Sequence, residues 1–128
     1  GEQVAPYRSC HLNHPSTKWA RESSANFLSL VEHTEAMIAE YKLRLNNRVH
    51  KCEAVLERCM ELFDKKLFDK HCPTPLPLAM PDSYKSENIV ESYRKFYASK
   101  PRMRYPEDRI PAWFTEYRNQ PFEIIKGV

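Results

Sequence analysis

Proline and glycine are distributed so unevenly that they divide this chain before any other feature is considered. Ten prolines and two glycines occur among the 128 residues, yet none of them falls between Pro15 and Pro73. Both residues interrupt helices, because proline removes a backbone donor and glycine adds backbone freedom. The uninterrupted stretch therefore favours long helices, whereas the proline-rich segment 71–81 cannot be helical.

Apolar residues recur at helical spacing in two stretches of the proline-free half. The first predicts a helix over 16–45, with Ser16 or Thr17 as its cap. Asn46–Asn47 is the expected break, and the second stretch predicts a helix over 48–70. Because the connection is short, we expect the two helices to be antiparallel neighbours.

The second half of the chain is expected to hold one more helix. Four prolines make 71–81 an irregular loop, and the apolar stripe beyond it predicts a helix over 86–99 with Ser86 as its candidate cap. The remaining segment, 100–128, is interpreted as an extended tail packed by aromatic residues, with one short helical turn at 111–118.

These elements predict an all-α fold. It consists of an antiparallel helical hairpin and a third helix, with a proline-rich loop and an extended aromatic C-terminal tail. The length predicts a single domain over 1–128. "FEIIKGV" could add weak strand pairing at the end of the tail.

Charge is only slightly unbalanced. The formal charge is +3, from 20 basic and 17 acidic residues, which by itself does not indicate nucleic acid. Two segments are more basic: 41–51 carries five cations, counting histidine, and no acid, and 100–109 carries four basic and two acidic residues. Both would suit phosphate groups, although solvated helix ends and loops explain them equally well.

Membrane and secretory features are not found in this sequence. No apolar run approaches the roughly 20 residues of a membrane span, and the first residues resemble no signal peptide. We therefore expect no membrane partner and a cytoplasmic location. The start at Gly1 leaves open whether upstream sequence is missing. Two glycines cannot build a glycine-rich phosphate loop, and no cofactor is expected.

The four cysteines are expected to be reduced thiols. Cys52 and Cys59 are two helical turns apart, on one apolar face. A weak alternative is zinc held by cysteines and histidines of two loops at one end of the hairpin, although the spacing fits no standard finger. The candidate ligands are Cys10, His11, His71 and Cys72.

The stretch "HLNHPSTKWARES" (11–23) is interpreted as both a helix cap and the rim of a site. Ser23 and Asn26 continue the face of Trp19 with polar groups, and polar groups on an inward face need partners. The expected partners are the Asn13–His14 turn and the "AMPDSYK" loop. On this hypothesis His14 shares one pocket with Asp82 or Tyr84 of that loop, with Arg21 at its mouth.

Candidate site residues follow from this clustering of polar, basic and aromatic groups. The catalytic candidates are His14, Glu22 and Glu40. The nucleic-acid-binding candidates are Asn13, Trp19, Arg21, Asn26, Arg44, His50, Lys51, Tyr84, Lys85 and Arg94. Capping, an i,i+4 ion pair and core packing are the structural alternatives for several of these.

Three stretches resemble a family of small, mostly uncharacterised proteins of tailed phages. They are "NHPSTKWARESSANFLSLVE", "EYKLRLNNRVHKCEAV" and "LPLAMPDSYKSENIVESYRKFYASK", and the match covers about residues 10–114. Some members are distantly similar to pyrimidine-dimer DNA glycosylases of the endonuclease V type, which are small, basic helical proteins. The resemblance implies that the protein is located in the cytoplasm of an infected bacterial host.

This resemblance also implies a chemistry. The dimer glycosylases use their own N-terminal amine as the nucleophile, which here would be that of Gly1 if Gly1 is the native start. Glu22 or Glu40 would stabilise the developing oxocarbenium charge. The leading hypothesis is thus a phage-derived protein that acts on DNA, as a glycosylase or another base-processing enzyme. The alternative is a non-enzymatic helical module that binds a phage or host protein, as an accessory subunit or an inhibitor.

Overall fold

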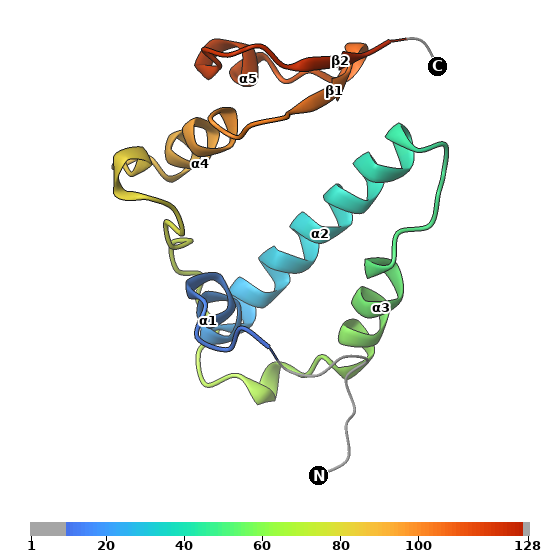
Figure 1. The fold of residues 1–128 in the computed structure, drawn as a ribbon. Helices are drawn as coiled ribbons and strands as arrows, with labels where there is room; N and C mark the ends of the chain where they lie inside the picture. Colours follow the sequence, from blue (N-terminus) through green and yellow to red (C-terminus); the bar gives the residue numbers. More distant parts are fainter. Residues whose placement is uncertain (1–9, 127–128) are drawn as a thin grey trace. The chain divides into compact units, whose positions relative to one another are not determined.

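The computed structural model describes residues 10–126 and is predominantly helical, with one small parallel sheet (Figure 1). The prediction of a helical protein is confirmed, whereas the prediction of an all-α fold is wrong because two strands pair in the tail. The chain groups into two compact units, Gly1–Leu76 and Pro77–Val128, and each is described by itself. The single domain stays a prediction.

The first predicted helix is two helices. α1 (Pro15–Glu22) and α2 (Ser24–Arg44) are separated by Ser23, whose backbone is extended at φ −147° and ψ 157°. The Ser23 hydroxyl accepts a hydrogen bond from the amide of Asn26 and so caps α2. The cap of α1 also differs from the prediction, since the Nδ1 atom of His14 accepts from the amide of Ser16.

The second predicted helix is shorter than the stretch 48–70. The connection turns at Asn46–Asn47, where both φ angles are positive, at 51° and 63°, as the asparagine pair indicates. α3 (Cys52–Leu62) then ends at Phe63, which is extended. Asp64 caps a 3₁₀ helix over Lys65–Leu67, so the chain leaves the α-helical path about two turns before the expected end.

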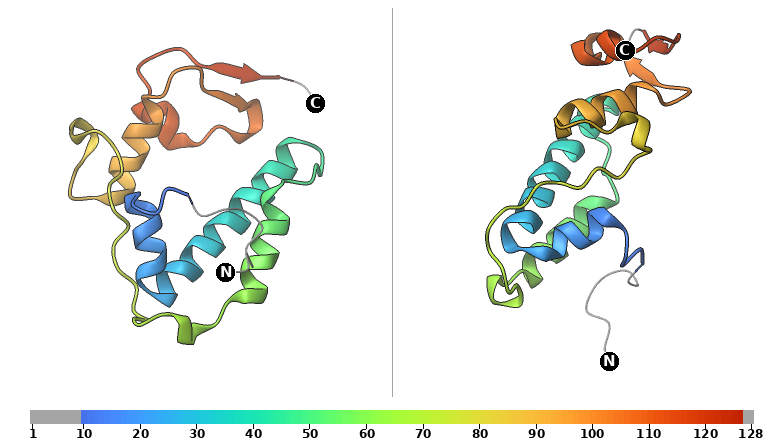
Figure 2. Two further views of the ribbon diagram at one scale, coloured as in Figure 1. Left: turned by 60° about the horizontal axis from the view of Figure 1, so that its bottom comes forward. Right: turned by 90° about the vertical axis from the view of Figure 1, so that its left-hand side faces the viewer.

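α2 and α3 run antiparallel, as predicted. The rings of Phe27 at the start of α2 and Phe63 beyond α3 stack with centroids 5.5 Å apart. At the opposite ends of the same helices, Lys42 pairs with Glu53 at 2.6 Å. The two helices are two arms joined by the turn at 45–51 (Figures 1 and 2). Between these contacts, only Val31 and Ile38 of α2 are buried apolar residues.

The second unit is built around Phe114, which has no exposed surface and packs with Ala98 and Tyr105. Its elements are α4 (Ile89–Ala98), β1 (Arg104–Pro106), α5 (Ala112–Tyr117) and β2 (Glu123–Ile125), with 3₁₀ turns at Asp82–Tyr84 and Glu107–Arg109. α5 confirms the helical turn expected at 111–118. β1 and β2 are parallel, with Arg104 opposite Glu123.

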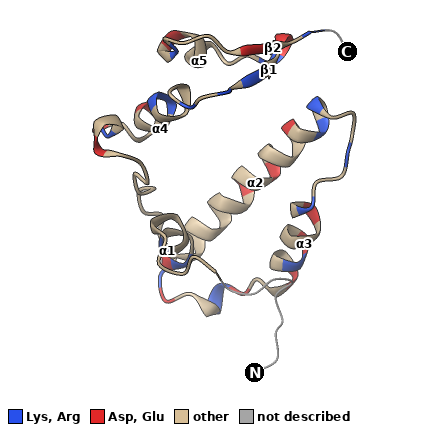
Figure 3. Ribbon diagram, viewed as in Figure 1, with Lys and Arg blue, Asp and Glu red and all other residues tan. Residues whose placement is uncertain are grey.

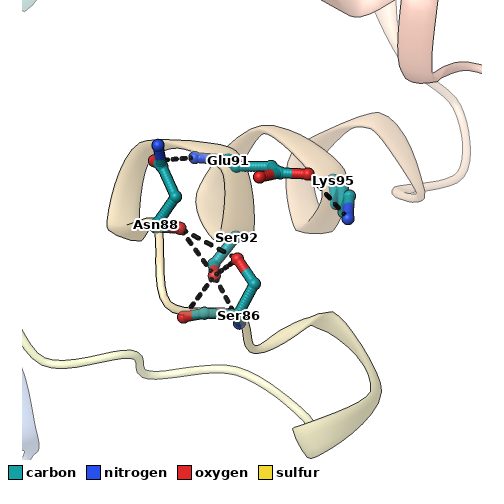
Figure 4. A network of polar contacts seen from close by, with 5 residues as sticks. All are labelled: Ser86, Asn88, Glu91, Ser92 and Lys95. Carbon is teal, nitrogen blue, oxygen red and sulfur yellow. Dashed lines mark hydrogen bonds and ion pairs between the residues drawn. The ribbon is translucent and has the colours of Figure 1, made fainter.

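The start of α4 is fixed by a polar network (Figure 4). Asn88, and not the predicted Ser86, caps the helix by accepting from the amide of Glu91 at 2.9 Å. Ser86 instead contacts the hydroxyl of Ser92, which has no exposed surface, through both its own hydroxyl and its amide. α4 therefore begins at Ile89 rather than at residue 86.

One arginine ties the end of α4 to the tail of the second unit. The guanidinium of Arg118 donates to the carbonyls of Ala98 and Lys100 on one side and of Gln120 and Pro121 on the other. It also lies over the ring of Phe114, 5.5 Å from the centroid. The tail is thus packed by its aromatic residues, as predicted, and is also held by hydrogen bonds.

Candidate nucleic-acid interface

Asn26 is the centre of the junction between α1 and α2. Its side chain has no exposed surface and makes three hydrogen bonds. The amide nitrogen donates to the carbonyl of Trp19 at 2.9 Å and to the hydroxyl of Thr74 at 2.7 Å, and the amide oxygen accepts from the Thr74 amide at 2.9 Å. Ser23 and Asn26 are therefore buried with partners, as the sequence indicates.

Those partners differ from the predicted ones. Apart from Trp19, the partners of Asn26 come from the segment 70–74. The same segment contacts Ser24, whose amide donates to the carbonyl of Lys70 and whose hydroxyl contacts His71. Trp19 completes the arrangement by donating from its indole nitrogen to the Thr74 carbonyl at 2.8 Å. We call these contacts of Trp19, Ser24 and Asn26 with residues 70–74 the α1–α2 clasp.

Several side chains of the polar stretch 11–23 make hydrogen bonds to the backbone and so stabilise the fold. His14 caps α1, and the guanidinium of Arg21 donates to the carbonyl of Leu12. Asn13 is exposed in the turn. His14 belongs to the first unit, whereas Asp82 and Tyr84 belong to the second, so their shared pocket stays a prediction.

The two acidic catalytic candidates do not meet. Glu22 ends α1 and accepts a long hydrogen bond, 3.4 Å, from the Thr74 hydroxyl. Glu40 lies 16 residues beyond the start of α2, which is about 24 Å along the helix axis, and pairs with Arg44 at 2.8 Å. The Gly1 amine lies outside the described residues. Glu22 and Glu40 therefore cannot share one catalytic site in this unit.

Two of the basic candidates in 44–51, Arg44 and His50, make contacts within the protein near the α2–α3 turn. Nδ1 of His50 accepts from the amide of Cys52, and its ring meets Tyr41 edge-on with centroids 4.6 Å apart. Arg44 pairs with Glu40, while Lys51 is exposed. The side chain of His50 is therefore engaged just before α3, by the amide of its first residue.

The proposed zinc ligands do not form a cluster. Within residues 10–126, no three side chains of His, Cys, Asp and Glu lie close enough together to hold a metal ion. His71 contacts Ser24 in the α1–α2 clasp, and Cys10 and Cys72 are exposed free thiols. Cys52 and Cys59 share one face of α3, as predicted, and line a hollow of about 230 Å³ against α2.

Cations and aromatic rings come together in the second unit. The guanidinium of Arg94 lies over the ring of Trp113, 5.8 Å from its centroid. Farther along, the ammonium of Lys100 lies over Phe96 at 4.2 Å. Tyr97 lies between these cations in the chain and is 47% exposed. We call Arg94, Tyr97, Lys100 and the rings of Phe96 and Trp113 the α4 basic–aromatic surface.

Neighbouring residues of this unit have structural roles. Tyr93 donates to the carbonyl of Pro77, and Tyr84 packs on Phe96 with centroids 5.4 Å apart. Lys85 pairs with Asp82 at 2.9 Å. Lys95 donates a hydrogen bond to Glu91 that raises the pKa of the ammonium above its ordinary value.

Of the predicted nucleic-acid contacts in this unit, Arg94 alone belongs to the α4 basic–aromatic surface. The pairing of Arg94 with Trp113 joins residues far apart in the sequence, so local spacing could not predict it. A signal was present for Tyr97 and Lys100, because they follow Arg94 at steps of three residues on a basic helix end.

Comparisons with known proteins add no assignment. No family model, curated protein or solved structure significantly matches this chain, so the resemblance to the phage family stays a prediction. As to membranes, every helix within residues 10–126 is too short or too polar to cross a bilayer.

Proposed function

We propose that this protein binds nucleic acid, and that the α4 basic–aromatic surface is where it does so. The observation that carries the proposal is the pairing of two cations with two rings, Arg94 with Trp113 and Lys100 with Phe96. Exposed Tyr97 lies between the two cations in the chain. Aromatic rings stack on bases while nearby cations neutralise phosphates, which is how proteins hold single strands.

The charges around this surface support the proposal. Arg94 and Lys100 are exposed, and each contacts a ring, so their charges remain accessible to a phosphate. Lys95, Lys85 and Arg104, by contrast, are paired with carboxylates. Basic residues mark α4 and β1 in Figure 3. A flexible single strand can follow such a surface more readily than a rigid duplex.

Binding, rather than base excision, is the function that this geometry favours. Glu22 ends α1, Glu40 lies about 24 Å along α2, and the candidate His14 is engaged as a cap. Borohydride trapping on dimer-containing or abasic DNA tests the glycosylase hypothesis separately. A covalent adduct would show that an amine of the protein attacks the sugar. The protein would then be an enzyme and not only a binding protein.

The test is fluorescence anisotropy with a labelled single-stranded 20-mer of dT over a range of salt concentrations. We expect Arg94→Gln with Lys100→Gln to lower the salt slope by about 1.4, at about 0.7 per neutralised phosphate on single strands. Tyr97→Ala should weaken binding by about 1–3 kcal/mol, the value of one stacked base, and leave the slope unchanged.

Arg58→Gln is the matched control, because it removes one exposed cation from α3. Its affinity should equal that of the unchanged protein. Equal losses in Arg58→Gln and in the α4 variants would mean that net charge alone drives binding, and absence of binding at low salt would refute the proposal.

A further inference from the structure

The seam between α2 and α3 is incompletely closed. A hollow of about 410 Å³ opens along it, with walls from both helices. Its apolar floor includes Ile38, which is buried, and Leu56, which is half-buried. Met60 also lines the hollow and remains 40% exposed. Exposed apolar side chains next to a groove are a feature of protein-binding surfaces.

The apolar surface continues beyond the hollow. Leu30 and Met37 of α2 are 41% and 47% exposed, and Leu30 lines the smaller hollow between the same two helices. Only two apolar residues of α2 are buried. α2 thus presents more apolar surface than α3 covers. Covering that surface with a partner would be favourable, because it removes apolar groups from water.

The rim of the hollow is acidic. Glu35 of α2 and Glu57 of α3 line it from opposite sides, and both are exposed. The cation in the lining, Lys42, is already paired with Glu53 at 2.6 Å. Within residues 10–126, no ion pair is formed by Glu35 or Glu57. Two carboxylates therefore flank an apolar floor without compensating cations.

We propose that this groove, which we call the α2–α3 groove, docks an amphipathic helix of a partner protein with basic residues on both sides of its apolar stripe. Apolar side chains at positions i, i+3 or i+4, and i+7 of such a helix would enter the groove. Lysines or arginines beside the stripe would face Glu35 and Glu57. The acidic rim sets the sign of the partner's charge.

The same charges argue against two other occupants. Nucleic acid is repelled by the carboxylates, so this surface is distinct in chemistry from the α4 basic–aromatic surface. A second copy docked face to face would bring Glu35 and Glu57 of both copies together, because a two-fold interface uses the same patch twice. The proposal concerns the first unit alone and does not depend on the proposed function.

The test uses two designed 16-residue peptides of the same apolar stripe, one with lysine and one with glutamate beside it. Isothermal titration with the full chain should detect the lysine peptide and not the glutamate peptide. Glu35→Gln with Glu57→Gln should weaken the lysine peptide by about three- to tenfold, as expected for two exposed ion pairs. Both substitutions are at exposed positions, so the fold is retained.

Glu61→Gln is the matched control, since it removes an exposed carboxylate of α3 that does not line the groove. It should leave the peptide affinity unchanged. A second variant, Met60→Lys, places a cation on the floor and should abolish binding of the lysine peptide. Equal binding of the two peptides, or binding of neither at millimolar concentration, would overturn the proposal. A concentration-dependent dimer abolished by Met60→Lys would show that a second copy is the occupant.

Discussion

Replacing Asn26 by alanine should unfold the first unit more readily than any other polar substitution in the stretch 11–26. Asn26 has no exposed surface, and the change leaves the Trp19 carbonyl and the amide and hydroxyl of the half-buried Thr74 without this partner. A hydrogen bond contributes about 1 kcal/mol net, so three of them predict a loss of about 3 kcal/mol.

That loss should be visible in the melting temperature. In a domain of 60–100 residues, 1 kcal/mol corresponds to about 4–8 °C, so a fall of about 12–24 °C is expected. Urea denaturation followed by circular dichroism gives the free energy. Hydrogen exchange, read on peptides of α1 and α2, assigns the loss to the first unit.

Asn13→Ala is the matched control, because Asn13 is exposed. It should change stability by no more than about 0.5 kcal/mol. Thr74→Ser keeps the amide and a hydroxyl and should be nearly neutral. If Asn26→Ala cost less than 1 kcal/mol, or no more than Asn13→Ala, the α1–α2 clasp would not be the element that holds residues 70–74.

Two further predictions concern the second unit. In Arg118→Lys the charge is kept, but one ammonium cannot donate to four carbonyls. The free energy of unfolding should fall by about 2 kcal/mol and hydrogen exchange in β2 should become faster. Arg102→Lys, at an exposed position, should change neither quantity. Asn88→Ala removes the cap of α4 and should lower the free energy of unfolding by about 1 kcal/mol. Asn88→Ser keeps a capping oxygen and should lose much less. Equal losses in the two variants would exclude capping as the cause.

The sequence predicted the helices better than their ends. Periodicity placed α2 and α3 and the turn at Asn46–Asn47, because those signals are local. The break at Ser23 was missed because no glycine or proline marks it. It depends on bonds to Lys70 and Thr74, which are nearly 50 residues away.

The candidate site was less predictable than the fold. The sequence correctly indicated that Ser23 and Asn26 are buried polar groups, but the residue that satisfies Asn26 lies in the proline-rich segment rather than in the "AMPDSYK" loop. Several site candidates, among them Trp19 and His50, make structural hydrogen bonds. Polar residues near helix ends are ambiguous from sequence, because a cap and a binding group use the same atoms.

The α1–α2 clasp also determines how the first unit responds to a pull on its C-terminal side. The chain leaves this unit after Leu76, and Thr74 lies two residues earlier, bonded through its amide, hydroxyl and carbonyl. Because Thr74 precedes Pro77 by three residues, tension applied from Pro77 reaches these bonds before it reaches α3. Single-molecule stretching from the C-terminal side should therefore give one abrupt rupture of this unit, and Asn26→Ala should lower the force at which it occurs.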